Sequence, residues 1–396
     1  MKKRSILLVI IFFISIIILS VNSNNKYLVK EESLATYIDG EKTDSFPAKG
    51  TVAFSKADCD NNTNIEWDND TWGLYVTNLS NKVKCNIYFK TGENAVTKIT
   101  NLASSDTTNM ASDDPDNNIR YIGANPNNYV YFNCDDYNNQ TSDTCELWRI
   151  IGVFNNIEKE DGTKENLIKI IREDSIGQYS WDYKSDGSAS NDWTKSTLQQ
   201  LLNNGAYYKG MSDFYYNDSI TATKIDLNNS GFKNDETKNA IETVAWNLGS
   251  SSTYDDVNTE MFYSLERNTN SVSNVSTKWN GKIALIYPSD YGYSTSGRTK
   301  NNRNICIKEN LYYWNNDSIS YCKDNSYLYK RDNYQWTLTI NSTNGTGAFN
   351  INAGGIISYD SVARHGYNVR PTLFLKSSIS IGIGDGSSTN PYQLSL

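Results

Sequence analysis

Six cysteines constrain this chain more than any other feature. They are Cys59, Cys85, Cys134, Cys145, Cys306 and Cys322. Their number is even, no Cys-x-x-Cys motif occurs, and the spacing of a zinc site is absent. Cysteines of this kind pair as disulfides when the chain is exported. Several pairings are open, and we expect the sequential one, 59–85, 134–145 and 306–322, because each of these pairs lies within one compact stretch.

The N-terminal residues indicate export. Lys2, Lys3 and Arg4 precede an apolar run from Ile6 to Val21, which is the pattern of a signal peptide or a signal anchor. The run is short for a bilayer-spanning helix, although flanking lysines can compensate. Because residues 21–23 form a poor cleavage site, we favour an uncleaved membrane helix over residues 1–23. A cleaved signal peptide is the alternative, and both place the rest of the chain outside the cytoplasm.

Charge and histidine content exclude several function classes. The net charge is −8, so the chain lacks the basic surface that nucleic acid binding requires. His365 is the one histidine, which excludes multi-histidine metal sites and disfavours histidine-based triads. Asp114, Asp116 and Asn118 have the spacing of a calcium loop, but Ile119 replaces the required glycine. We therefore expect no cofactor, and calcium stays an unsupported alternative.

The hydrophobic pattern predicts an α+β protein with two domains. Alternating runs at 51–54, 72–76 and 85–89 indicate a small β-sandwich-like domain over residues 24–94. Residues 95–120 are rich in Ser, Asp and Asn and predict a polar linker. Residues 121–396 predict one large α+β domain.

The large domain begins with two strands, Leu147–Phe154 and Leu167–Arg172, which we expect to pair as a hairpin. Two helices are predicted over Lys195–Asn203 and Asp235–Leu248, and Asn234 is a candidate cap for the second one. Further strands are predicted over 283–287, 335–340, 348–351 and 369–375.

Several runs of residues together resemble a family of uncharacterised surface proteins from gut bacteria. These runs are Asp116–Val130, Leu147–Val153, Lys282–Gly292, Val369–Leu375, Gly384–Gly386 and Asn390–Leu394. The C-terminal half also resembles, more loosely, C-type-lectin-like domains related to formylglycine-generating enzymes. This resemblance implies a head with two helices and a twisted antiparallel sheet. Those enzymes use a reactive cysteine pair near their C-terminus, whereas the last cysteine here is Cys322, so the resemblance does not imply their activity.

No motif of a common enzyme class occurs in the chain. We therefore expect a non-catalytic binding or adhesion protein that lies outside the cell, anchored by its N-terminal helix, with a glycan or a cell-surface protein as partner. One alternative is a secreted glycan or cell-wall hydrolase, for which Asp182 and Asp192 are the candidate carboxylates. A structural surface protein is the other alternative.

The segment between Cys306 and Cys322 is the candidate ligand site. Sugars stack on aromatic rings, and amides and carboxylates bind their hydroxyl groups. The segment offers both kinds of side chain, at Tyr312, Tyr313, Trp314, Asn315, Asn316 and Asp317. The competing hypothesis is that the aromatic residues fill the core beneath a long loop.

Overall fold

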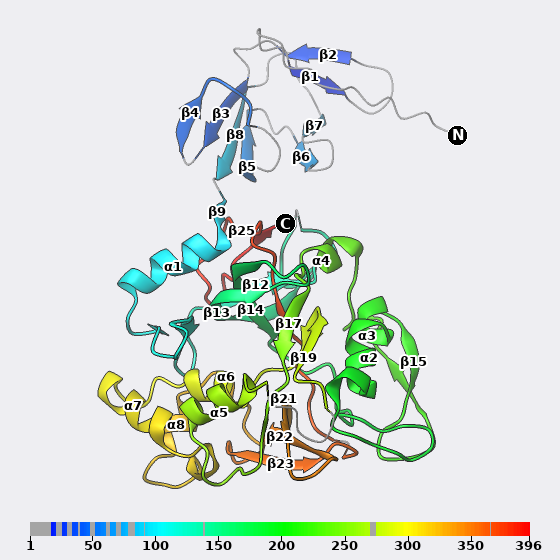
Figure 1. Cartoon of the computed structure of the whole chain (residues 1–396). Helices are drawn as coiled ribbons and strands as arrows, with labels where there is room; N and C mark the ends of the chain where they lie inside the picture. Colours follow the sequence, from blue (N-terminus) through cyan, green and yellow to red (C-terminus); the bar gives the residue numbers. More distant parts are fainter. Residues whose placement is uncertain are drawn as a thin grey trace. The chain divides into compact units, whose positions relative to one another are not determined.

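The computed structural model of the chain divides into two compact units, which are described separately here (Figure 1). The first unit spans residues 1–93 with residues 381–383 and 395, and the second unit contains the remaining residues. The structure describes the whole chain except residues 1–16, 21–25, 30–33, 39, 48–51, 61–63, 69–72, 78–83, 91, 138, 270–274 and 365.

The N-terminal unit consists of strands in the part that is described. Its sheets are a four-stranded sheet of order β4-β3-β8-β5 and the pairs β1-β2 and β6-β7. The strands are β1 (Ile17–Ser20), β2 (Lys26–Val29), β3 (Leu34–Ile38), β4 (Glu41–Thr43), β5 (Ala53–Cys59), β6 (Asn64–Asp68), β7 (Gly73–Thr77) and β8 (Cys85–Lys90).

Strand β8 lies inside the four-stranded sheet, parallel to β3 and antiparallel to β5. Cys85, Ile87 and Phe89 alternate along it and are all buried, as the period of two predicts. The Cys59–Cys85 disulfide joins directly opposite residues of β5 and β8. The expected β-sandwich is not found, because the described strands outside this sheet form only two-stranded pairs.

The predicted N-terminal membrane helix is not supported. Residues 17–20 form strand β1, which pairs with β2, and the other residues of the predicted helix lie outside the described part of the chain. Among the residues that the structure describes, no helix is both long and apolar enough to cross a bilayer.

A seven-stranded sheet forms the centre of the large unit (Figure 1). Its order is β10-β11-β13-β14-β24-β20, and β12 also pairs with β13. The strands are β10 (Met110–Ala111), β11 (Ile119–Tyr121), β12 (Tyr129–Phe132), β13 (Glu146–Glu158), β14 (Lys164–Arg172), β20 (Ile283–Ala284) and β24 (Thr372–Phe374). The predicted hairpin of residues 147–154 and 167–172 is confirmed as β13 and β14.

Strand β13 is buried on both faces over Trp148–Phe154. Its near-continuous run of large apolar residues suits a strand that is covered on both sides. Gly152 sits at a bulge in this strand, opposite Arg120 of β11. A Cβ atom at Gly152 would lie 1.9 Å from the carbonyl oxygen of Ile119, so the close approach of β11 requires glycine here.

Smaller sheets and short helices surround this centre. One sheet has the order β18-β21-β22-β23 and includes a parallel pair, β18 with β21. Its strands are β18 (Ser250–Ser251), β21 (Gln335–Asn341), β22 (Gly347–Ile351) and β23 (Ile357–Ser361). The other strands are β9 (Glu93–Asn94), β15 (Ser212–Tyr215), β16 (Thr223–Asp226), β17 (Val244–Asn247), β19 (Lys278–Gly281), β25 (Ser380–Ile381) and β26 (Leu394–Ser395).

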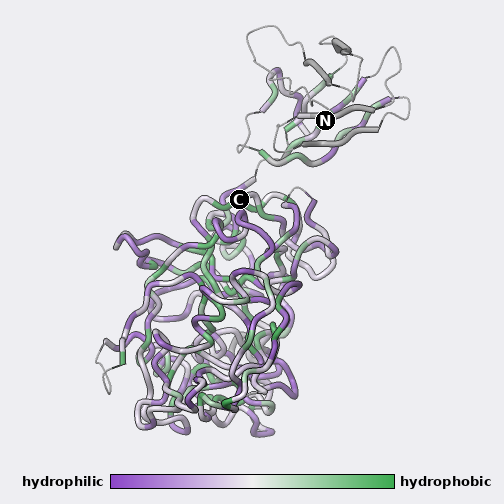
Figure 2. The backbone as a smooth tube through the Cα atoms, turned by 90° about the vertical axis from the view of Figure 1, so that its right-hand side faces the viewer, coloured by the Kyte–Doolittle hydropathy of each residue, from purple (hydrophilic) through white to green (hydrophobic). Residues whose placement is uncertain are grey.

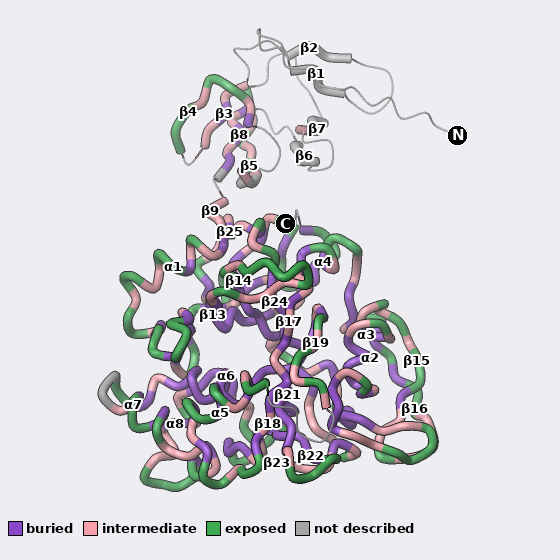
Figure 3. Tube along the Cα trace, in the orientation of Figure 1, coloured by how far each residue is buried: buried purple, intermediate pink, exposed green. Residues whose placement is uncertain are grey.

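The helices that the structure describes are all short. They are α1 (Ala95–Ser105), η2 (Trp193–Lys195), α2 (Thr197–Asn203), α3 (Ala206–Lys209), α4 (Asp235–Asn239), α5 (Thr259–Glu266), α6 (Pro288–Tyr293), α7 (Lys300–Lys308), η3 (Leu311–Tyr313) and α8 (Tyr321–Asp324). In Figure 2 the hydrophobic parts of this unit gather along its middle, and Figure 3 shows buried residues along β13, β17, β21 and α6.

The predicted fold class is wrong. The expected head had two helices and one twisted antiparallel sheet, whereas the chain is mixed α/β, with 18% helix, 34% strand and several small sheets. Residues 95–120, expected to be a polar linker, contain α1, β10 and the start of β11 and belong to the large unit. Some of their polar side chains are buried, among them Asp114 and Asn118.

The predicted helix Asp235–Leu248 is helical only at its start and contains a strand near its end. Helix α4 begins as expected, with the side chain of Asn234 accepting a hydrogen bond from the Thr237 N–H. It ends at Asn239, and residues 244–247 form β17, which pairs with β19. Val244 and Trp246 are buried while Ala245 and Asn247 are half-buried, so the residues follow a period of two here. The other predicted helix is confirmed as α2.

Four charged side chains form a network in the core of the large unit. Arg120 Nε lies 2.7 Å from Asp114 Oδ2, and Arg120 Nη1 lies 2.9 Å from Asp290 Oδ1. Lys169 Nζ lies 2.5 Å from Asp290 Oδ2. All four residues are 4% exposed or less. Two carboxylates and two cations balance one another, as buried charges require.

This network explains why the acidic segment 113–118 is ordered. Asp114 Oδ1 accepts hydrogen bonds from the N–H groups of Asp116 and Asn118, at 3.2 and 2.8 Å. Asp116 Oδ2 accepts a hydrogen bond from Tyr263 Oη and lies 3.6 Å from Arg267 Nε. The carboxylates with calcium-loop spacing therefore face protein cations and donors. Among the described residues, no cluster of three or more metal-ligating side chains is found.

Asp290 holds its charge because of its two cations. Burial acts to raise its pKa, but Lys169 and Arg120 outweigh burial and lower the pKa to about 2. Glu266 of α5 lies near Asp290, and its pKa is shifted in the opposite direction. Burial is the largest effect on Glu266 and raises its pKa to about 7, although Arg267 and Ser289 partly oppose it.

We predict that Glu266→Gln changes how stability depends on pH. The folded-state pKa of Glu266, about 7, exceeds the ordinary value of 4.5. The stability that protonated Glu266 contributes is therefore fully present below pH 4.5 and is lost as pH rises through 7. Relative to the variant, the wild type should lose up to about 3 kcal/mol of unfolding free energy across this interval. Urea unfolding of both proteins at several pH values measures the difference, and a difference that is constant with pH contradicts the prediction.

Candidate functional site

The predicted ligand segment does not present its aromatic residues as one surface. The Cys306–Cys322 disulfide closes the segment as expected. Trp314 is fully buried and packs on Tyr291, with 5.2 Å between the ring centroids. Tyr312 is half-buried against Tyr254. The exposed members are Tyr313, Asn315, Asn316 and Asp317. Trp314 therefore belongs to the core, and its side chain is not brought together with the exposed amides and carboxylate.

The carboxylates proposed for a hydrolase are both held by structural contacts. Asp182 is fully buried and accepts hydrogen bonds from the N–H groups of Thr197 and Ser190, at 2.9 and 2.8 Å. Asp192 caps η2 by accepting a hydrogen bond from the N–H of Thr194. These contacts account for both residues without catalysis. His365 lies outside the described residues.

A cavity of about 290 Å³ lies beside the Cys134–Cys145 disulfide. This volume is just below the range of about 300–1,000 Å³ that is typical of small-molecule sites. The cavity is lined by residues of β12, β13 and β14 and of three loops, namely Tyr131, Ser142, Cys145, Glu146, Leu147, Arg172, Asp174 and Ser388. It combines one aromatic ring with carboxylates, a guanidinium and hydroxyl groups.

Glu146 and Arg172 form the fixed charged pair of this cavity. Arg172 Nε donates to Glu146 Oε2 at 3.0 Å and Nη2 donates to Oε1 at 3.1 Å, which is a two-pronged contact. Trp148 Nε1 also donates to Oε2, at 3.1 Å. Burial acts to lower the pKa of Arg172, but Glu146 outweighs burial and raises it. Burial is also the largest effect on Glu146 and raises its pKa, although Arg172 opposes this effect. The two-pronged contact keeps the pair in one orientation.

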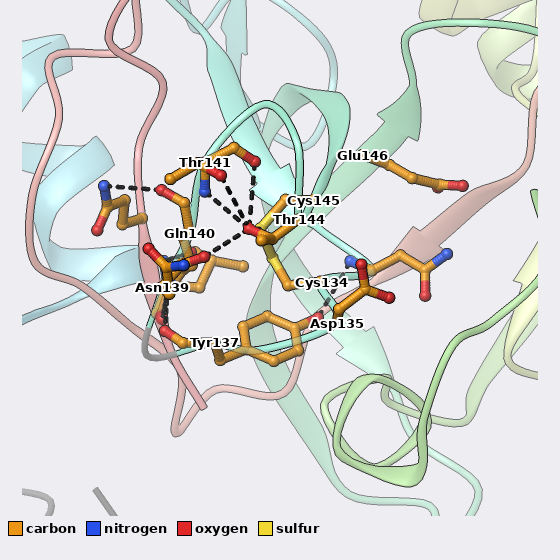
Figure 4. The surroundings of a disulfide bond; sticks show 12 residues. Cys134, Asp135, Tyr137, Asn139, Gln140, Thr141, Thr144, Cys145 and Glu146 are labelled. Carbon is orange, nitrogen blue, oxygen red and sulfur yellow. Dashed lines mark hydrogen bonds between the residues drawn. A yellow bond between two sulfur atoms is a disulfide. The ribbon is translucent and has the colours of Figure 1, made fainter. Parts of the chain in front are cut away.

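The loop that the Cys134–Cys145 disulfide closes supplies Ser142 and Cys145 to the cavity lining. Figure 4 shows the disulfide and the hydrogen bonds around it. Thr144 Oγ1 accepts a hydrogen bond from the N–H of Thr141 at 3.0 Å. Gln140 Nε2 donates to the carbonyl of Leu394 at 2.6 Å, and its Oε1 accepts from the Leu394 N–H at 2.9 Å. The disulfide and these hydrogen bonds restrain the described residues of the loop, and such restraint lowers the entropy lost when a ligand binds.

A second charged cluster fixes the neighbouring end of β14. Glu173 lies between the cavity residues Arg172 and Asp174 in the sequence, and Lys330 Nζ donates to its Oε1 at 2.5 Å. Arg370 and Arg149 approach its other oxygen at 3.6 and 3.9 Å. Burial is the largest effect on Arg370 and lowers its pKa to about 10. Three cations thus surround one carboxylate in this otherwise acidic protein.

The cavity residues were not predicted from the sequence. The sequence signal was present in the hairpin: Glu146 and Arg172 are charged residues at the ends of two strong apolar strands. The register places Trp148 opposite Arg172, so Glu146 lies two residues beyond the paired position. The register of the hairpin brings these two side chains together, and this register cannot be predicted from the sequence alone.

No family model, no curated protein and no solved structure matches this chain. The resemblance to surface proteins of gut bacteria therefore stays a prediction.

We predict that Trp314→Ala lowers the free energy of unfolding by about 3–5 kcal/mol, because it leaves a large cavity in the core. Tyr313→Ala, at the exposed neighbouring position, should cost less than about 1 kcal/mol. Trp314→Phe is the conservative control. It keeps a ring against Tyr291 and removes an indole N–H that has no hydrogen-bond partner among the described residues. Chemical denaturation of the three variants checks the order, and equal small losses would show that Trp314 is not a core residue.

Proposed function

We propose that this protein is an extracellular binding protein and that its large unit binds a polar, hydroxyl-rich ligand such as a glycan. Three disulfides and no free cysteine among the described residues agree with an oxidising compartment. The observation that supports the ligand class is the cavity beside Cys134–Cys145. Tyr131 offers an aromatic face there, and Glu146, Asp174, Ser142 and Ser388 offer hydrogen-bonding groups.

The cavity suits binding better than catalysis. Glycoside hydrolysis requires two carboxyl groups with separate acid and base roles. Glu146 is engaged on both oxygens by Arg172, so neither oxygen is free to donate a proton. Asp174 is exposed. The arrangement instead resembles a ligand site, in which a few fixed polar groups orient a molecule against a ring.

We predict that Tyr131→Ala and Asp174→Asn each weaken glycan binding at least about tenfold, which corresponds to about 1.4 kcal/mol. A glycan array with the purified protein identifies the ligand, and calorimetry with the best hit measures the dissociation constants. Both positions are at least partly exposed, so thermal midpoints should change little. Phe214→Ala is the matched control, because Phe214 is an aromatic residue of β15 that is 64% exposed and does not line the cavity.

The same array separates the alternatives. Binding that is unchanged in both cavity variants would place the ligand elsewhere and contradict this site. Shortened glycans after incubation would favour a hydrolase. An array without any bound glycan, together with self-assembly of the purified protein, would favour a structural surface protein.

A further inference from the structure

Lys169 and Asp290 contact each other where water is excluded. The distance from Lys169 Nζ to Asp290 Oδ2 is 2.5 Å, and the two side chains are each 1% exposed. Aromatic rings surround the lysine nitrogen at 4.6–5.6 Å from their centroids, and they belong to Phe154, Trp246, Tyr287 and Phe374. An amine and a carboxyl group are thus held in contact in an apolar enclosure.

Both oxygens of Asp290 are also oriented by other donors. Arg120 Nη1 donates to Oδ1 at 2.9 Å, and the backbone N–H of Tyr287 donates to Oδ2 at 3.0 Å. Oδ1 therefore faces a guanidinium, while Oδ2 faces the lysine. Such an arrangement holds the carboxyl carbon in one orientation relative to the nitrogen, which is the positioning that reactions between neighbouring groups require.

We propose that Lys169 and Asp290 condense to form an intramolecular amide bond that joins strand β14 to helix α6. The product is a covalent cross-link between two segments that lie 121 residues apart in the sequence. It exchanges two buried charges for one neutral amide, which removes the cost of keeping an ion pair out of water.

The reaction needs no co-reactant. A proton passes from the Lys169 ammonium to Asp290 Oδ2 within the ion pair, and the neutral amine attacks Cγ to form the C–N bond. Arg120 stabilises the negative charge that develops on Oδ1 in the tetrahedral intermediate. The nitrogen gives a second proton to Oδ2, the Cγ–Oδ2 bond breaks, and Oδ2 leaves as water. Burial favours the first step because it acts to lower the pKa of Lys169 and to raise that of Asp290. The mutual attraction of the two charges and the contact of Asp290 with Arg120 oppose this step and hold the pKa of Asp290 low.

The chain contains a matched comparison for this pair. Lys330 Nζ lies at the same distance, 2.5 Å, from Glu173 Oε1, but the two side chains are 32% and 16% exposed. Because that pair is partly exposed, water can solvate its charges, and we expect the ion pair to persist. We therefore expect an amide bond between Lys169 and Asp290 and none between Lys330 and Glu173.

Peptide mapping of the purified, reduced and denatured wild-type protein tests this proposal. Trypsin cleaves after a free lysine but not after one in an amide bond. The cross-linked protein should give residues 165–172 joined to residues 283–298, with a mass equal to their sum less one water. Cleavage after Lys169 that releases residues 165–169, together with an unmodified peptide 283–298, would overturn the proposal.

Two variants locate the bond. Lys169→Arg keeps the positive charge but has no amine that forms this amide, and Asp290→Ala removes the carboxyl group. Each should restore the mass of one water to the reduced chain and lower the thermal midpoint. Lys330→Arg is the control and should leave the cross-linked peptide unchanged. The peptide map of the wild type decides whether the amide bond exists, even where a variant fails to fold.

Discussion

The contact of Asp290 with Arg120 and Lys169 is the interaction on which the rest of the large unit depends. It brings together β11, β14 and the first turn of α6, which are far apart in the sequence. Removing Asp290 would cost about 3–5 kcal/mol, because Lys169 would lose the carboxylate that balances its charge in the core. The network therefore works as a whole, and it also orders the acidic segment that precedes β11.

The β13–β14 hairpin connects this network to the candidate ligand site. Lys169 lies in the middle of β14, and Arg172 at its end reaches Glu146 at the start of β13. The disulfide-closed loop 134–145 lies next to Glu146 and supplies Ser142 and Cys145 to the cavity lining. The hairpin is buried along most of its length, so the same packing that holds the charges in place also fixes the cavity wall.

Local signals predicted part of this structure, and long-range contacts decided the rest. The three disulfide pairs, the hairpin and α2 follow from spacing, periodicity and caps. Residues 235–248 were expected to be one helix, but pairing with β19 makes Val244–Asn247 a strand. The acidic run from Asp113 to Asn118 was interpreted as a solvated linker, because a sequence does not show that Arg120 and Asp290 will meet Asp114 in the core. Trp314 was a candidate ligand residue, because the sequence does not show that its side chain packs on Tyr291 in the core.

Native-state hydrogen exchange tests the central account most directly, because it reports whether the acidic segment is part of the core. The N–H of Asn118 is bonded to Asp114, and the N–H of Asn117 is bonded to the Asp114 carbonyl. The account predicts that peptides covering residues 112–120 are protected as strongly as peptides from β13 and exchange only when the large unit unfolds. Exchange of these amides at the rate of exposed surface loops, while β13 stays protected, would contradict it.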